Sequence, residues 1–257
     1  TFTYQWLVCN EAGEECSEIS KATGPTLKLV AGLIGDTVEV VVTATNAAGA
    51  RSETSAASGV VRGILPSNTG APSIVGSLVE GQTLSATSGS WSGSEPISYG
   101  YQWLVCNAAG EECSEISKAT GSTLKLVAGL IGDTVEVVVT ATNAAGSRSE
   151  TSAASGVVQG ILPSDEGLPS ITGSLLSGRL LTAHPGTWTG SEPITYSYQW
   201  QLCNALGKSC GNISEATSST FKLLGLDVGL TLDVVVTAKN IAGSRSATSP
   251  VTGLIGL

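Results

Sequence analysis

The sequence predicts an all-β protein built as a row of antiparallel β-sandwiches. Three observations lead to this fold class. A long motif recurs at a fixed interval, hydrophobic and polar residues alternate between the turns, and the separating segments are rich in Gly, Asn and Pro. Alternation with a period of two is typical of strands with one buried face, and helical periodicity is almost absent.

The repeat is about 97 residues long, as its central tryptophans show. Trp6, Trp103 and Trp200 are 97 residues apart (103 − 6 and 200 − 103), and no insertion interrupts the period. Such a unit is too long for a solenoid repeat and has the size of an independently folding domain. We therefore expect three domains, which cover residues 1–65, 66–162 and 163–257.

The first unit begins part-way through the repeat. The later copies open with "GAPSIVGSLVEGQTLSATSGSWSG" and "GLPSITGSLLSGRLLTAHPGTWTG", and neither segment has a counterpart near Thr1. Two interpretations are open. The chain is a window from a longer protein, or it is a processed subunit whose first unit has an open sheet edge that a neighbour's strand completes.

The strands are predicted from alternation within the unit. In Thr37–Asn46, the residues Val38, Val40, Val42 and Ala44 fall on one face. The phrase "TYQWLVC" near the start of the chain and the phrases "GQTLSATSG" and "STLKLV" of the second copy alternate in the same way. About seven short strands in fewer than a hundred residues predict an antiparallel sandwich.

Turn-forming residues separate these strands. Asn46–Gly49, Asn143–Gly146 and Asn240–Gly243 each lie between two strands, and we expect them to form hairpin loops in which Gly supplies a positive φ. The segments "GILPSNTGAPSI" and "GILPSDEGLPSI" carry paired prolines, so we expect short, semi-rigid linkers there.

The pattern Tyr-Gln-Trp…Cys…Gly…Cys, followed by "VVVTATNAAGS", resembles the bacterial immunoglobulin-like repeats of large actinobacterial surface and secreted proteins. The resemblance covers both complete units and the partial one. It implies tandem immunoglobulin-like sandwiches in which the indoles of Trp6, Trp103 and Trp200 pack the core. It identifies a scaffold rather than a site.

The cysteines depart from the pattern of animal immunoglobulin domains, because no Cys lies on the strand of Val38 to Ala44. Both cysteines of a unit instead flank one hairpin, with six residues between them. We interpret them as disulfides, which indicate an oxidising, extracellular compartment. The pairs are Cys9–Cys16, Cys106–Cys113 and Cys203–Cys210.

Neither a structural metal nor catalysis fits these residues well. A zinc site needs four ligands, whereas each unit has two Cys and no nearby His. His184 is the chain's single histidine, so a catalytic set that uses it cannot recur in every unit. We expect no cofactor and no enzymatic activity. Calcium binding by linker acids such as Asp165 and Glu166 stays an open alternative.

The composition agrees with an extracellular location. The formal net charge is −9, and the 12 Lys and Arg residues are scattered. A negative surface without basic clusters argues against nucleic acid and anionic membranes as partners. The longest apolar runs are about five residues, so no membrane span is expected in this segment.

One deviation is hydrophobic. "LVAGLIGDTV" places Leu33 and Ile34 in a connection, and the second copy repeats them as Leu130 and Ile131, where the third copy has Asp227 and Val228. An apolar loop residue lowers solubility unless it is covered. Two interpretations are open, a cap on the end of the sandwich and a contact with another domain or subunit.

These observations favour a structural array, either a stalk or the subunit of an extracellular filament, whose partners are copies of itself or neighbouring repeats. The alternative is an adhesin-type module that recognises a carbohydrate or a cell-surface partner. Its candidate aromatic residues are Trp91 and Trp188.

Overall fold

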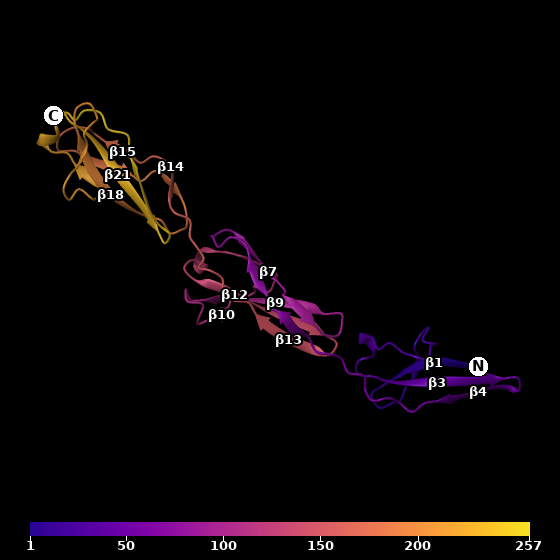
Figure 1. The fold of residues 1–257 in the computed structure, drawn as a ribbon. Coiled ribbons are helices and arrows are strands. Elements are labelled where there is room, and N and C mark those ends of the chain that lie inside the picture. Colours follow the sequence, from indigo (N-terminus) through magenta and orange to yellow (C-terminus); the bar gives the residue numbers. More distant parts are fainter.

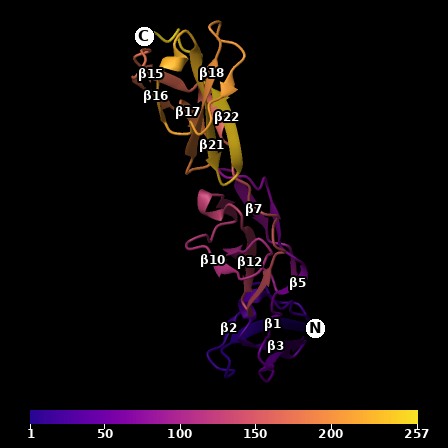
Figure 2. The same ribbon diagram turned by 90° about the vertical axis from the view of Figure 1, so that its left-hand side faces the viewer.

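The structure, a computed structural model, describes residues 1–257 as three domains in a row (Figure 1 and Figure 2). The row is seen in both views, so the molecule is a rod. The N-terminus belongs to the domain at one end and the C-terminus to the domain at the other. The helical segments are three 3-10 turns, η1 (Ala31–Leu33), η2 (Ala128–Leu130) and η3 (Gly225–Asp227), and none of them is long enough to cross a bilayer.

The second domain is a β-sandwich of nine short strands, where the sequence predicted about seven. The strands are β5 (Ser67–Gly70), β6 (Ser73–Val75), β7 (Thr83–Thr87), β8 (Ser90–Ser92), β9 (Ser98–Cys106), β10 (Ser114–Glu115), β11 (Thr123–Lys125), β12 (Thr134–Asn143) and β13 (Gly146–Thr151). One sheet has the order β10-β9-β12-β13, the other has the order β11-β7-β6, and β5 pairs with β8. All these pairs are antiparallel.

The third domain repeats this topology. Its strands are β14 (Ser164–Gly167), β15 (Ser170–Gly173), β16 (Leu180–His184), β17 (Thr187–Thr189), β18 (Thr195–Cys203), β19 (Gly211–Asn212), β20 (Thr220–Lys222), β21 (Thr231–Asn240) and β22 (Gly243–Thr248). The sheets have the orders β19-β18-β21-β22 and β15-β16-β20, with β14 paired to β17.

The first domain consists of a single four-stranded sheet. Its strands are β1 (Phe2–Cys9), β2 (Ser17–Glu18), β3 (Thr37–Asn46) and β4 (Gly49–Thr54), in the order β2-β1-β3-β4. The segment "TLK" forms strand β11 in the second domain but no strand at Thr26–Lys28. The reason is that β11 pairs with β7, and the first domain contains no equivalent of β7.

The alternating residues form the core as predicted. On β12 the side chains of Val135, Val137 and Val139 are fully buried, whereas Glu136 and Val138 between them lie on the other face and are only partly buried. Trp103 on β9 lies in the same cluster with residues of the opposite sheet, such as Leu84. The two sheets therefore enclose one core, which is the arrangement that a period of two produces.

The predicted linkers are shorter than expected. Ser67–Gly70 and Ser164–Gly167 are strands, and they pair with the segments that carry Trp91 and Trp188. Asp165 and Glu166 accordingly lie on β14 and not in a linker, which corrects the prediction. The linkers outside any strand are therefore only Gly63–Pro66 and Gly160–Pro163. The polar residues that follow each linker belong to an edge strand, where their backbone groups form hydrogen bonds.

Candidate functional site

Each disulfide closes the turn that follows the central strand. Cys9 is bonded to Cys16, and the Oδ1 atom of Asn10 accepts hydrogen bonds from the backbone N–H groups of Ala12 (3.1 Å) and Glu14 (2.9 Å). A covalent closure of this size stabilises a fold by about 2–3 kcal/mol. The other two units repeat the arrangement with Cys106–Cys113 and Asn107, and with Cys203–Cys210 and Asn204.

A carboxylate lies beside each disulfide but does not complete a metal site. The side chains of Glu39, Glu136 and Asp233 each come within 4.8 Å of the two sulfur atoms of their unit. Metal ions bind thiolates, and here both sulfur atoms are already joined to each other. A single carboxylate therefore remains, which is too few ligands for zinc.

Asp233 is the most unusual of these carboxylates. Its side chain is 5% exposed, and its Oδ2 atom lies 3.7 Å from the Sγ atom of Cys203. Its Oδ1 atom is buried and has no hydrogen-bond partner. Burial raises the pKa of this carboxyl group above its usual value, because removal from water disfavours the charged form.

The three repeat tryptophans hold the turns of their own domains. The Nε1 atom of Trp103 donates to the carbonyl of Gly121 at 2.9 Å, and the indole is fully buried. Trp200 makes the equivalent bond to Ser218 and is also fully buried. Trp6 makes the bond too, to Gly24 at 3.0 Å, but it is only half-buried.

The four apolar loop residues separate into two pairs. Leu33 and Leu130 are each 7% exposed and pack in the cores of their own domains. The equivalent Asp227 is buried as well, and its Oδ2 atom accepts a hydrogen bond from the N–H group of Leu224 at 2.8 Å. The third domain thus has a buried aspartate that is hydrogen-bonded to the turn, and the first two domains have a buried leucine at the same position. Ile34 and Ile131 instead lie where two domains meet.

An asparagine clamps the linker at the first joint. The Nδ2 atom of Asn143 donates to the carbonyl oxygens of Ile64 and Ser94, both at 2.8 Å. The hydroxyl of Ser94 accepts the N–H group of Ile64 at 2.9 Å. The linker backbone is thereby satisfied by side chains of the domain that follows it, which fixes its direction.

The second joint has the same geometry. The Nδ2 atom of Asn240 donates to the carbonyl oxygens of Ile161 and Ser191, both at 2.8 Å, and the Ser191 hydroxyl accepts the N–H group of Ile161 at 2.7 Å. In addition, the Ser191 hydroxyl donates to the carboxylate of Glu80 in the preceding domain. The two joints therefore share one construction, and the second has one further link.

A glycine brings the domains into contact at each joint. A Cβ atom on Gly63 would lie 2.6 Å from the Cδ1 atom of Ile34 and 2.8 Å from the Cβ atom of Ala145. There is thus no room for a side chain between the loop of the first domain and the hairpin of the second. The second joint places Gly160 between Ile131 and Ala242.

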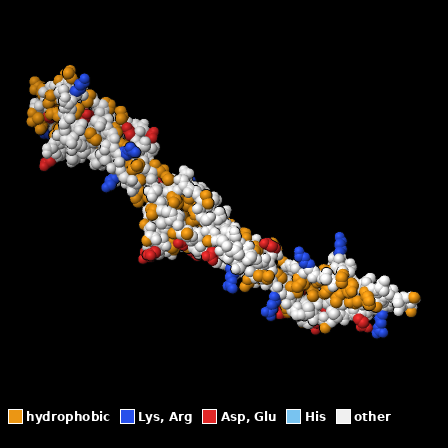
Figure 3. Space-filling model, in the orientation of Figure 1, with side chains coloured by type: hydrophobic (Ala, Val, Ile, Leu, Met, Phe, Trp, Pro, Cys, Tyr) orange, Lys and Arg blue, Asp and Glu red, His pale blue; other side chains and the backbone are white.

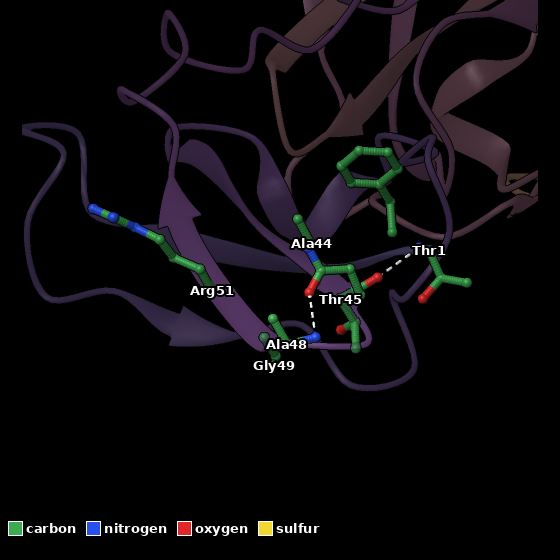
Figure 4. A pocket seen from close by; sticks show the side chains of 9 residues that line it. Thr1, Ala44, Thr45, Ala48, Gly49 and Arg51 are labelled. Atoms are coloured by element: carbon green, nitrogen blue, oxygen red, sulfur yellow. Dashed lines mark hydrogen bonds between the residues drawn. The ribbon is translucent and has the colours of Figure 1, made fainter.

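The tip of the first domain carries a shallow cavity of about 530 Å³. Figure 4 shows Thr1, Thr45 and Ala48 gathered at this tip, with the side chain of Arg51 pointing away. The N-terminal amino group donates to the carbonyl of Thr45 at 2.8 Å. At the corresponding hairpin tips of the second and third domains, Asn143 and Asn240 contact the linker that precedes the domain.

The remaining predicted residues are held by local contacts. The indole nitrogens of Trp91 and Trp188 donate to the carbonyls of Ser88 (2.8 Å) and Pro185 (2.7 Å). The exposed His184 on β16 is hydrogen-bonded to the hydroxyl of Thr172 at 2.9 Å. These contacts leave neither indole as an exposed platform.

Sequence reasoning missed the residues of the joints. The sequence predicts only hairpin turns at Asn143 and Asn240, and the alternation of its residues does not mark Ser94 or Ser191 as contact residues. The repeated phrases "GILPS", "GSEPI" and "NAAG" or "NIAG" carried the signal. Their contact, however, joins segments 79 residues apart, which alternation along one strand cannot reveal.

Three of the solved structures that match this chain each contain several domains. The three N-terminal domains of the highly immunogenic outer capsid protein of bacteriophage RB49 match 100% of this chain and 89% of their own length, with 13% identity and a TM-score of 0.29. Chicken CNTN1 domains FN1–FN3 match 99% and 88%, with 17% identity and a TM-score of 0.25. Drosophila OTK extracellular domains 3–5 match 96% and 84%, with 14% identity and a TM-score of 0.27.

No protein-family model matches the chain, and no curated protein sequence is similar to it. At these identities the structural likeness concerns the fold alone. The chain is an all-β protein of tandem immunoglobulin-like sandwiches, as the sheets of its second and third domains show.

Proposed function

We propose that the chain is a non-enzymatic structural segment of an extracellular protein, which holds other parts at a distance as a stiff rod. The observation that carries this proposal is the repetition of the joint. Asn143 and Asn240 clamp their linkers through the same pairs of hydrogen bonds, each 2.8 Å long. Because the two joints have the same contacts, each domain has the same orientation relative to the domain before it. A chain built in this way is extended.

The disulfides and the fold support a place outside the cell. Disulfides persist in oxidising compartments and are rare in the cytosol. Each unit has one, and the chain has no free cysteine. Together with the resemblance to bacterial immunoglobulin-like surface repeats, this supports a stalk at a bacterial cell surface or in a secreted fibre.

In the filament version of this proposal, copies of the chain join one another. If the purified protein stays monomeric in sedimentation and forms no filaments by electron microscopy, the filament version is wrong and the stalk version remains. The adhesin alternative has no specific support, because Trp91 and Trp188 are packed and hydrogen-bonded.

Small-angle scattering tests the rod. A sandwich spans about 35–40 Å, so we expect a maximal dimension of about 100 Å. The double substitution Asn143→Ala and Asn240→Ala removes the clamps, and we expect a broader distribution of shapes with more bent conformers. Asn46→Ala is the matched control, since Asn46 occupies the same position but clamps no linker. A wild-type protein as flexible as the double variant would contradict the proposal.

A further inference from the structure

The disulfide of the third domain presents one sulfur atom to solvent and buries the other. Cys210 is exposed, whereas Cys203 is 2% exposed. A thiolate from solution can therefore reach the Sγ atom of Cys210 but not the Sγ atom of Cys203. Attack on Cys210 makes Cys203 the leaving sulfur, in a place that is closed to water.

A buried carboxyl group lies beside the sulfur that would leave. The Oδ2 atom of Asp233 is 3.7 Å from the Sγ atom of Cys203, and its Oδ1 atom is buried without a hydrogen-bond partner. Burial favours the uncharged acid form of a carboxyl group, and it raises the pKa of Asp233 for this reason. In its acid form the group holds a proton next to Cys203.

No cation offsets the burial of Asp233. Its strand, β21, is flanked there by Gln201 of β18 and by the segment 249–252, and neither carries a charged side chain. The other titratable residues that face it are the two bonded cysteines. Figure 3 shows Lys and Arg side chains at separate places along the visible face of the rod, and the single ion pair of the molecule lies in the first domain. Lys208, in the turn between the cysteines, therefore makes no ion pair with Asp233.

The sister units place their carboxylates differently. Glu39 lies against the exposed sulfur of its unit, with 3.8 Å between its Oε2 atom and the Sγ atom of Cys16. A carboxylate at that place repels an incoming thiolate. Glu136 is half-buried and stays in contact with water. Only the third unit has a buried carboxyl group beside its disulfide.

We propose that the Cys203–Cys210 disulfide is a site of thiol–disulfide exchange at which Asp233 supplies the proton. A small-molecule thiolate attacks the Sγ atom of Cys210 and forms a new S–S bond there. The old S–S bond breaks, and its electron pair goes to the Sγ atom of Cys203. Asp233 transfers its proton to that sulfur, which leaves a thiol on Cys203 and a carboxylate on Asp233. No further oxidant or reductant is needed, because one disulfide is exchanged for another.

The product should persist because the released thiol is buried. A buried thiol beside a carboxylate forms the attacking thiolate poorly. Cys203 therefore returns slowly to the mixed disulfide on Cys210, and the added group stays on the exposed sulfur. The third domain would thus carry a small thiol as a reversible covalent modification. This inference goes beyond the proposed function, and the rod does not depend on it.

The test compares two disulfides in the same molecule. The whole protein is exposed to mercaptoethanol, the reaction is stopped with acid, and peptide mass spectrometry gives the initial rate at each disulfide. The ratio of the third-domain rate to the second-domain rate cancels the ionisation of the added thiol. We expect the adduct on Cys210, and we expect this ratio to fall by about tenfold or more between about pH 4 and about pH 8, as Asp233 loses its proton. An adduct on Cys203, or a ratio independent of pH, overturns the proposal.

The direction of the pH effect separates proton transfer from local unfolding. Loss of the proton from Asp233 destabilises the third domain, because the folded state binds that proton more tightly than the unfolded state does. Exchange through an unfolded third domain would therefore make the ratio rise with pH. Such a rise would also overturn the proposal.

Matched variants identify the proton donor. Asp233→Asn keeps the size of the side chain and removes the proton, so we expect the third-domain rate to fall about tenfold at the acid end and the ratio to become independent of pH. Asp233→Glu, which restores the residue type of the sister units, should bring the third-domain rate close to the second-domain rate. Glu136→Gln is the control and should leave the wild-type profile unchanged. A wild-type profile in Asp233→Asn would show that another group donates the proton.

Discussion

Asp233 shows how one side chain changes the chemistry of a position that the repeat otherwise keeps. The first two copies have Glu39 and Glu136 there, and these longer side chains remain partly in water. The aspartate is shorter by one methylene group and is buried beside Cys203, with one oxygen unpartnered. Its pKa is raised by this loss of hydration.

This raised pKa predicts a pH dependence for the third domain. A carboxyl group whose pKa is higher in the folded than in the unfolded state binds more protons when folded. Its stabilising contribution is therefore complete below the ordinary value of 3.8 and is lost as the pH rises through the raised pKa. We expect Asp233→Asn to raise the melting temperature of the third domain at pH 7 by a few degrees. Calorimetry should show no such gain in strong acid; a gain that is the same at every pH would exclude the carboxylate as its cause.

The repeat tryptophans allow the same substitution to be compared in two environments. Trp103→Ala removes a fully buried indole, and we expect it to destabilise the second domain by about 3–5 kcal/mol. Trp6→Ala should cost about half as much, because part of that indole already faces water. Denaturation with domain-resolved hydrogen exchange measures both. Equal costs would mean that Trp6 is covered in solution.

At the scale of elements, a strand needs its partner as well as its own sequence. Thr123–Lys125 pairs with β7 and forms β11, whereas the same three residue types at Thr26–Lys28 form no strand. We expect the amides at 26–28 to exchange much faster than those at 123–125 in the isolated protein. Mass-spectrometric hydrogen exchange distinguishes the two segments, since Pro25 and Ser122 precede them. Similar rates would contradict the open edge.

The disulfide hairpins are the second element with a measurable role. We expect the double substitution Cys106→Ala and Cys113→Ala to lower the free energy of unfolding of the second domain by about 2–3 kcal/mol, because it releases a closed loop in the unfolded chain. Urea denaturation monitored in that domain measures the loss. The unfolding of the third domain, which keeps its own disulfide, serves as the internal control.

For the whole molecule, the joints decide the shape. Gly63→Val would place a side chain where Ile34 and Ala145 leave no space, so the first joint should open. We expect scattering to report a broader range of shapes, with the stability of each sandwich changed by less than about 0.5 kcal/mol. Gly59→Val is the control, since a Cβ atom there meets nothing within 4 Å. Identical scattering from both variants would show that the contact does not hold the domains in line.

The sequence by itself determined the fold class, the domain period, the buried faces of the strands and the two cysteines that meet in each hairpin. These properties depend on residues close together in the chain, through alternation, turn chemistry and spacing. Only the tertiary structure decided that the side chains of Leu33 and Leu130 pack in the cores of their domains. It also decided that Ile34 and Ile131 lie at the joints, and that asparagine side chains bind the linkers. Those outcomes depend on contacts between segments far apart in the chain, where two equal local sequences acquire different surroundings.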